Sequence, residues 1–320
     1  MTDTKKTHGT DAQALDGNRP SIDIVYFTFN RIAYTRQTLP ALIENAQVPF
    51  ALTIIDNGST DGTIEYLHEM RAAYPDTIRD IVLNTENKGL AGPTNDFWMG
   101  SSAEFVGKVD NDTLVPAGWL RRMLEAHKKS DKLGVIGGYH FNLGYVDQDA
   151  LERRSVRENG VRLVPDAFIG GCCYLMRRSV QVRHGFMGVT PGRKTSGWTE
   201  YQKGLVKKGY VNGYLFPLLL VEHFDDPLSK YNLAFTDHLE TSRISMGEKG
   251  IPDREEQLHW YAQDAKRVEA GTSLRELGLP VLLDASVDLT ASLAWKYATL
   301  RLKIKKDLRT LRSFFRKRRK

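Results

Sequence analysis

The chain has 320 residues, of which 41% are hydrophobic and 26% charged, and its formal net charge is +6. It contains no uninterrupted apolar stretch long enough to span a bilayer. The two cysteines, Cys172 and Cys173, are adjacent, which excludes a disulfide framework and fits a reducing cytosol. The polar segment Met1–Pro20 lacks an apolar signal region, so we expect a disordered leader there.

Strands and helices alternate through the first 130 residues. Runs of β-branched and aromatic residues indicate buried strands, and a helical pattern follows each one after a polar turn. We expect Asp61 to cap the second helix and Pro116 to lie in the first turn of the fourth. The expected strands are 22–27, 51–55, 81–83 and 104–109, and the expected helices end near residues 43, 70, 98 and 129. This alternation predicts an α/β fold with a mostly parallel central sheet flanked by helices.

The pattern loosens after about residue 134. Strands with longer loops between them are expected at 135–136, 161–164, 168–176 and 214–221. Helices are expected at 198–208 and 253–270, with a connector at 271–280.

Polar side chains follow four of the predicted strands. Thr28, Asp56, Asn87 and Asp110 fall at strand ends or in the loops that follow them, where sheets of this kind bind ligands. Asp110 and Asp112 would repel each other unless a cation lay between them. Hard divalent cations take carboxylate oxygens and share them with phosphate. The pair therefore predicts a metal site that holds a diphosphate, whereas an isolated pair is more simply a solvated turn.

Four motifs, in this order and spacing, resemble family 2 glycosyltransferases with the GT-A fold. They are Phe27–Arg31, Ile55–Thr63, Asn87–Gly89 and Asp110–Asp112, and the resemblance covers about residues 22–224. It implies a GT-A catalytic domain over 21–225, with a Rossmann-like nucleotide-sugar-binding half at 21–133 and an acceptor half at 134–225. Beyond it we expect a flexible loop and helical region at 226–280 and a C-terminal helical extension, a basic amphipathic tail, at 281–320.

The resemblance also implies contacts with the nucleotide sugar at the four strand ends. Asp56 looks like the carboxylate that accepts a hydrogen bond from the base, with a turn-forming role as the alternative. Many relatives carry Arg before Asn95, but this chain has Thr94, so that phosphate contact is absent or comes from a residue such as Lys88. The expected binding residues are Thr28, Asn30, Arg31, Asp56, Asn57, Ser59, Asn87, Lys88, Gly89, Asn95, Asp110 and Asn111.

In the family pattern Asp112 binds the metal directly, and Asp110 looks closer to the ribose or to metal-bound water. His223, which follows an apolar run, resembles the His that completes the metal shell in related GT-A enzymes; a structural His is the alternative. The resemblance thus implies a metal site at Asp110, Asp112 and His223, with Mn²⁺ or Mg²⁺ as the cofactor.

The segment Thr195–Glu200 resembles the place where the family has an acidic pair at the start of a helix. The pair here is Thr199-Glu200, so Glu200 is the expected catalytic base. The alternative is an exposed Glu favoured by the helix dipole. Trp198 and Tyr201 flank it and are expected to contact the acceptor, because aromatic faces suit sugar CH surfaces, although both could equally be core residues.

The tail has a chemistry of its own. Residues 296–320 carry twelve Lys and Arg against one Asp, a local charge of +11 that leaves −5 for the rest of the chain. Trp295 adds an amphipathic ring to an apolar stripe made of Tyr297, Leu300, Ile304, Leu308, Leu311 and Phe315. A basic amphipathic helix is typical of an anionic membrane surface. A solvated or homodimer-forming helix is the alternative, and we expect no nucleic-acid partner because no nucleic-acid fold accompanies the tail.

The resemblance implies an inverting, metal-dependent glycosyltransferase in surface polysaccharide or glycoconjugate synthesis. Its donor would be a UDP-, GDP- or dTDP-linked sugar, and its acceptor a saccharide or lipid-linked hydroxyl. We expect it to be cytoplasmic and peripheral at the inner face of the membrane. Two alternatives are a nucleotidyltransferase, for which Thr28–Arg31 lacks the Gly-rich basic loop, and a non-catalytic nucleotide-sugar-binding module recruited to the membrane.

Overall fold

The computed structural model describes residues 21–189, 197–234, 254–282, 286–290 and 292–317. The predicted leader at 1–20 and residues 235–253 of the predicted loop lie outside these ranges, as do Thr195 and Ser196. The side chains of Leu311 and Phe315 in the predicted apolar stripe are likewise outside the described part.

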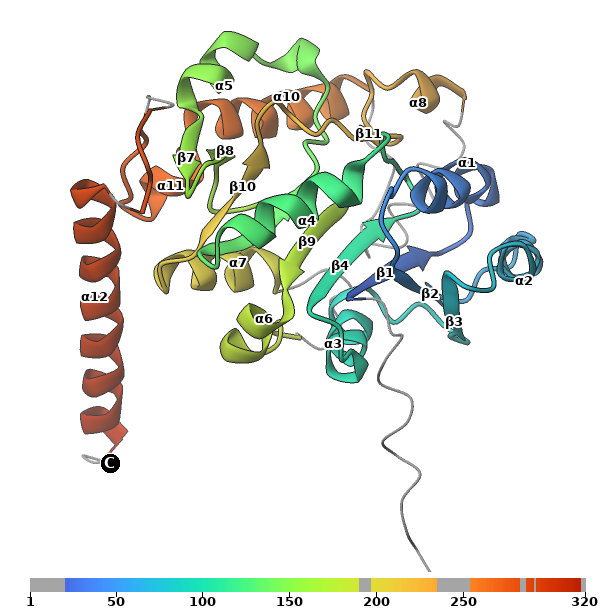
Figure 1. Ribbon diagram of the computed structural model, residues 1–320, viewed down its shortest axis with the longest axis horizontal. Helices are drawn as coiled ribbons and strands as arrows, with labels where there is room; N and C mark the ends of the chain where they lie inside the picture. The colour runs from blue at the N-terminus through green and yellow to red at the C-terminus, as the bar shows by residue number, and fades with distance from the viewer. Residues whose placement is uncertain (1–20, 190–196, 235–253, 283–285, 291, 318–320) are drawn as a thin grey trace, which may run out of the picture.

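A nine-stranded sheet forms the centre of the molecule, in the order β3-β2-β1-β4-β9-β6-β10-β8-β7 (Figure 1). Its strands are β1 (Ile22–Thr28), β2 (Ala51–Asp56), β3 (Ile78–Leu83), β4 (Phe105–Asp110), β6 (Leu133–Gly137), β7 (Val156–Glu158), β8 (Val161–Pro165), β9 (Cys173–Arg177) and β10 (Val211–Leu215). Within this sheet β9 and β8 run against the other strands, so the sheet is mostly parallel, as predicted. A separate antiparallel ribbon pairs β5 (Thr113–Leu114) with β11 (Glu222–His223).

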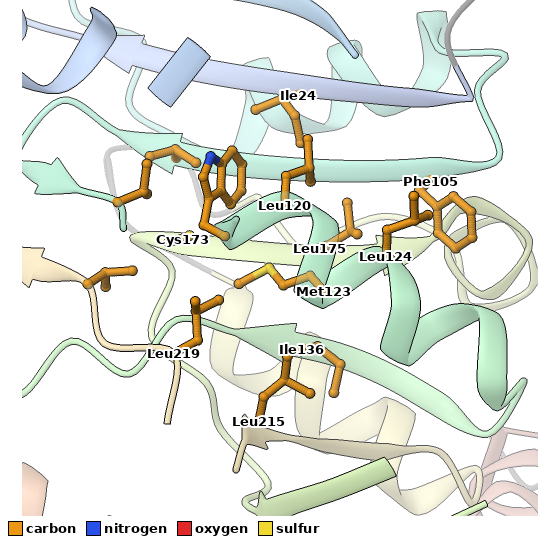
Figure 2. Packing of buried hydrophobic residues seen from close by; sticks show 14 of the residues in the cluster. Ile24, Phe105, Leu120, Met123, Leu124, Ile136, Cys173, Leu175, Leu215 and Leu219 are labelled. Carbon is orange, nitrogen blue, oxygen red and sulfur yellow. The ribbon is translucent and has the colours of Figure 1, made fainter. Parts of the chain in front are cut away.

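Helices cover both faces of the sheet. Successive residues of a strand point to opposite faces: Ile24 and Tyr26 of β1 belong to one buried cluster, Val25 and Phe27 to the other. The first cluster includes α1 (Ile32–Glu44), α2 (Thr63–Ala73) and α4 (Trp119–Lys129), and the second α3 (Ala91–Gly100), α6 (Arg178–His184) and α7 (Trp198–Lys207). Figure 2 shows α4 packed over the sheet. Met123 of this helix belongs to the same buried cluster as Leu175 on β9 and Ile136 on β6.

The remaining described elements lie mainly toward the C-terminus. They are η1 (Leu143–Tyr145), α5 (Gln148–Arg154), α8 (Lys230–Ala234), α10 (Arg254–Ala270), α11 (Thr272–Glu276) and α12 (Leu293–Lys317). Helix α10 packs against α11, η1 and α5 and runs along one end of the sheet (Figure 1).

Several predicted boundaries are wrong, for local reasons. The predicted strand 168–176 begins only at Cys173, because the amides of Ile169 and Gly170 bond to the side chains of Gln202 and Tyr214 instead of a strand. The predicted strand 214–221 ends at Leu215, before Pro217, which has no N–H to offer a neighbouring strand.

Helix boundaries also differ from the predictions. Helix α4 begins at Trp119 rather than around Pro116, after Gly118 at a φ of 73° that favours glycine. The third helix begins at Ala91, after the loop that contains Asn87, and ends at Gly100, two residues beyond the predicted end. The predicted connector 271–280 contains the helix α11.

Helix α12 extends from the body (Figure 1), and its apolar residues lie on two faces, one buried and one exposed. Trp295 and Ala298 are 2% and 9% exposed, and they join the first buried cluster with Leu302 packed against it. The predicted amphipathic ring of Trp295 is therefore part of the core. The stripe Leu293, Tyr297, Leu300, Ile304 and Leu308 is exposed instead, between 50% and 82%. None of the described helices combines the length and the apolar character that a membrane crossing needs.

Candidate functional site

The carboxylate of Asp56, at the end of β2, organises the first two predicted loops. Its two oxygens accept hydrogen bonds from the hydroxyls of Thr28 and Ser59 and from the backbone amides of Gly58 and Ser59. A carboxylate offers about four acceptor positions, so these bonds fill it, and Asp56 is fully buried. The turn-forming role is thus present. Recognition of the nucleotide base by Asp56 stays a prediction. It requires that Asp56 give up one of these hydrogen bonds and accept one from the base instead.

Asparagine side chains tie the loops at the strand ends together. Asn30 accepts a hydrogen bond from the amide of Thr60, and Asn57 donates to the carbonyl of Gly89. Asn87 accepts from the amide of Gly89 across a tight turn, where Gly89 has a φ of 71°. The predicted nucleotide-binding residues are therefore gathered at one edge of the sheet, with their side chains holding the loops in place.

Three other predicted binding residues have separate settings. Lys88 is exposed at this edge. Asn95 exchanges two hydrogen bonds with the backbone of Met187, and Asn111 donates to the carbonyl of Asn30. Asn95 and Asn111 therefore fix the backbone around the site.

Arg31 is buried and held by two carboxylates. Its guanidinium lies 3.2 Å from Asp112 and also contacts Asp225, and it covers the ring of Tyr34. Burial works against the charged form, but the charges of Asp225 and Asp112 outweigh it and raise the pKa of Arg31. The predicted contact of Arg31 with a nucleotide stays a prediction; in this arrangement its charge is balanced within the protein.

Asp110, at the end of β4, is paired with Lys108 two residues earlier on the same strand. The ammonium lies 2.5 Å from the carboxylate and 2.7 Å from the carbonyl of Gly171. Burial raises the pKa of Asp110, opposed by the charge of Lys108 and reinforced by that of Asp112. Both carboxylate oxygens of Asp110 lie within contact of the Lys108 ammonium, so a ligand at Asp110 would have to compete with this ion pair.

His223 meets Asp112 through the short β5–β11 ribbon. His223 is paired with Thr113, the neighbour of Asp112, and its Nε2 lies 3.7 Å from a carboxylate oxygen of Asp112. Its Nδ1 is 3.0 Å from the hydroxyl of Tyr261. Burial opposes the charged form of Asp112, but His223 and Arg31 outweigh it and lower its pKa.

These three residues have the donor chemistry that a divalent cation requires. Asp110 and Asp112 offer carboxylate oxygens and His223 offers an imidazole nitrogen, and the second ring nitrogen of His223 is bonded to Tyr261, as is usual for a metal-binding His. Within the described residues, however, no three His, Cys, Asp or Glu side chains are gathered closely enough to hold an ion. Arg31 and Lys108 supply the neighbouring positive charge instead, so a cation would have to draw the three side chains together.

A cavity of about 820 Å³ opens beside this cluster. Asp110, Lys108 and His223 line one side of it, and Trp198 lines another, stacked on Tyr174 with ring centroids 4.3 Å apart. Neither Thr28 nor Asp56 is among its lining residues. The residues Asp110, Asp112 and His223 are called the metal-type cluster below. The cavity extends from this cluster away from the loops that follow β1 and β2.

The structure separates the three residues that were expected on the acceptor side. Trp198 lines the cavity and donates to the carbonyl of Ile169. Tyr201 is 5% exposed and packs against Trp98 and Trp198, so its position is that of a core residue. The side chain of Glu200 is 75% exposed, lies 3.6 Å from Lys203, and does not line the cavity.

Sequence reasoning missed several residues of the site. Lys108 could have been found, because residues two apart on a strand share a face and Asp110 was already singled out. Asp225, Tyr261 and Asp264 gave no local signal, since their relation to the site depends on contacts across the chain.

Comparisons with known proteins agree with this arrangement. The sequence model described as Glycosyl transferase family 2 matches residues 23–183. A Nostoc protein described as a glycosyltransferase is 24% identical over 115 residues, 36% of this chain and 35% of that protein. A poly-β-1,6-N-acetyl-D-glucosamine synthase of Staphylococcus epidermidis is 26% identical over 117 residues, 37% of this chain and 28% of that enzyme. The matched stretch thus spans about a third of the length of these relatives.

Two solved structures share the fold at low sequence identity. One is a mannosyltransferase, PcManGT from Pyrobaculum calidifontis, in complex with GDP-Man and Mn²⁺. Its TM-score is 0.53 at 18% sequence identity, and the match covers 89% of this chain and 81% of the mannosyltransferase chain. The other is TarS 1–349 of S. aureus in complex with UDP-GlcNAc. Its TM-score is 0.50 at 13% sequence identity, and the match covers 79% of this chain and 74% of the TarS chain. Both have the GT-A fold that the strand-end motifs predict.

Proposed function

The chain belongs to glycosyl transferase family 2, and we propose that it moves a sugar from a nucleoside diphosphate sugar to a hydroxyl of a saccharide or lipid-linked acceptor. The observation that carries the proposal is that Asp110 and His223 line a large cavity while Asp112 lies 3.7 Å from His223. In a mostly parallel sheet, ligands bind at this edge.

The donor is a sugar linked to a nucleoside diphosphate. This rests on the family and on the two structural neighbours, which hold GDP-Man and UDP-GlcNAc. The nucleoside would lie over the loops that Asp56 organises, and the sugar would point into the cavity. A UDP-, GDP- or dTDP-linked sugar fits this description equally.

We include a divalent cation, Mn²⁺ or Mg²⁺, in the proposal. Asp112 and His223 would hold it, and Asp110 would bind it directly or through water in exchange for part of its pairing with Lys108. Oxygen and imidazole donors suit these cations. When bound, such a cation neutralises charge on a diphosphate leaving group. The chain's own contribution is to fix the carboxylates through Arg31 and Lys108.

The proposal also includes docking of α12 on the anionic cytoplasmic leaflet. The buried face of this helix, at Trp295 and Ala298, fixes it to the body. The opposite stripe stays exposed among basic residues, and residues 296–320 have a charge of +11. Each Lys or Arg near an anionic surface contributes on the order of 1 kcal/mol. Docking would bring the cavity close to a lipid-linked acceptor, as surface polysaccharide or glycoconjugate synthesis requires.

A thermal-shift screen tests the function directly. UDP, GDP and dTDP are each added to the full chain with Mn²⁺, with Mg²⁺ or with EDTA. A nucleotide at about a hundred times its Kd stabilises the fold by about 2.7 kcal/mol. We expect one nucleotide to raise the melting temperature only when a cation is present. The absence of any shift, with all three nucleotides and both cations, would contradict the proposal.

Hydrolysis of the donor separates an enzyme from a binding module. Many transferases slowly pass the sugar to water, so release of the nucleoside diphosphate from the sugar nucleotide that binds indicates turnover. A chain that binds the donor but releases no diphosphate, with or without candidate acceptors, would be the non-catalytic module.

A further inference from the structure

Helix α10 forms one wall of the cavity, although it lies beyond the residues that match the family. Its lining residues recur every three or four positions, which puts them on one face of the helix. They are Trp260, Tyr261, Asp264, Arg267 and Val268. Trp260 is 41% exposed, so the wall offers a large aromatic surface next to charged groups.

Contacts at two points fix where α10 crosses the cavity. Near its middle, the hydroxyl of Tyr261 is 3.0 Å from His223, which faces Asp112. Near its end, the carbonyl of Val268 accepts a hydrogen bond from the buried Arg154. Asp264 is three residues after the first contact and four before the second. At 1.5 Å per residue it lies about 4.5 Å along the axis from Tyr261, and it lines the same cavity as Asp110 and His223.

Four described carboxylates line the cavity, and three of them are engaged. Asp110 is paired with Lys108. Asp166 accepts from Ser273 and lies 3.6 Å from Arg154.

Glu276 is paired with Arg267 at 2.7 Å. The side chain of Asp264, by contrast, has no hydrogen bond or ion pair to any residue that the structure describes, and Arg267 acts on it through its charge alone. A general base must be free to take a proton, and Asp264 is the cavity carboxylate that meets this condition.

Its environment also favours this role. Asp264 is exposed by its accessible surface, but the atoms around it in the cavity wall exclude part of the solvent and raise the pKa of its carboxyl, against the smaller opposing effect of Arg267. A carboxylate whose pKa lies above its ordinary value is a stronger acceptor of protons. Glu200, the base expected from the sequence, differs from Asp264 in that it does not line the cavity.

We propose that Asp264 is the general base of the transfer reaction and that the α10 wall is the acceptor side of the cavity. The inference rests on the proposed function. The acceptor hydroxyl gives its proton to the carboxylate of Asp264 as its oxygen forms a bond with the anomeric carbon of the donor sugar. The bond from that carbon to the diphosphate oxygen breaks, its electron pair stays on that oxygen, and the nucleoside diphosphate leaves.

The test compares Asp264→Asn with Glu255→Gln in the full chain. The second change removes an exposed carboxylate of the same helix that does not line the cavity. Release of nucleoside diphosphate is followed with the sugar nucleotide that binds the unmodified chain, in the presence of its cation. We expect kcat of Asp264→Asn to fall about a hundredfold or more, with the KM for the donor nearly unchanged. We expect Glu255→Gln to behave like the unmodified chain.

Three further measurements make the result decisive. Equal melting temperatures of Asp264→Asn and the unmodified chain show that the fold is intact, and partial recovery in Asp264→Glu shows that a carboxylate is what is needed. A kcat of Asp264→Asn within a few-fold of the unmodified chain, or a large loss in Glu200→Gln alone, would overturn the inference and leave the transferase function standing. Failure of the transferase function itself would appear differently, as absence of donor turnover in the unmodified chain.

Discussion

Arg31 and Asp225 form a buried ion pair across 194 residues of sequence. Arg31 has a left-handed backbone, with a φ of 65°, in the loop that follows β1. Its guanidinium also reaches Asp112, so one side chain joins the first loop, the metal-type cluster and the segment after β11. This pairing holds the two sides of the site together without a ligand.

Arg31→Ala should lower the free energy of unfolding. It leaves the carboxylates of Asp112 and Asp225, which are only 13% and 10% exposed, without their cation. The expected loss is about 3 kcal/mol, because removing one partner of a buried pair strands the other charge. Chemical denaturation measures it. Arg121→Ala, which breaks an exposed pair with Glu125, should cost at most about 1 kcal/mol, and equal losses in both variants would contradict the structural role of Arg31.

Asp112→Asn should abolish turnover and the cation-dependent part of nucleotide binding. The change keeps the shape of the side chain but removes the charge that faces His223 and Arg31. The thermal-shift screen should show no difference between Mn²⁺ and EDTA for this variant. Excess EDTA should have the same effect on turnover of the unmodified chain; full activity in its presence would falsify the metal role.

Polar substitution of the exposed α12 stripe should release the chain from anionic membranes. Tyr297, Leu300 and Ile304 are at least half exposed, whereas Trp295 and Ala298 on the other face are buried. A triple change to Ser at the first three positions should therefore reduce sedimentation with anionic liposomes and spare donor hydrolysis. Val182→Ser, at an exposed apolar residue elsewhere, is the matched control.

The same experiment distinguishes the two candidates for what the exposed stripe contacts, an anionic membrane and a second copy of the chain. Electrostatic docking predicts binding to anionic vesicles and little binding to neutral ones. Equal binding to both, or to neither, would count against it. A mass that halves in solution when the stripe is made polar would instead identify the homodimer alternative.

Stability should fall as the pH drops from about 6.5 to about 4, in part through His127. Burial of the ring in the core next to Phe105 lowers the pKa of this residue to about 4, against the opposing effect of the hydrogen bond between Nε2 and the carbonyl of Leu175. Between these pH values the unfolded chain binds a proton that the folded chain does not, so stability rises with pH. The full contribution is present above about pH 6.5 and amounts to about 3 kcal/mol.

The variant His127→Gln checks the assignment, since its amide can still donate to Leu175 but does not titrate. Denaturation curves at pH 7 and pH 5 should differ less for the variant than for the unmodified chain. An unchanged difference would show that other groups cause the pH dependence.

The sequence by itself determined the arrangement of the first half of the fold. Alternation of apolar residues is a local property, so the run Ile22–Phe27 could be assigned to a strand without knowledge of its partners. Turn residues such as Asp56 and Gly89 are also local signals. Parallel strands bring their carboxyl ends to one edge, and the four predicted strand-end clusters therefore meet there.

Only the tertiary structure decided what the individual side chains do. Glu200 and Tyr201 are adjacent in sequence, yet one is exposed and the other is packed between tryptophans, because the face of a helix that is buried depends on its neighbours. Arg31 finds Asp225, and Asp264 reaches the cavity, through contacts between segments more than a hundred residues apart. Such contacts depend on how the whole chain packs, and a local sequence pattern carries no information about them.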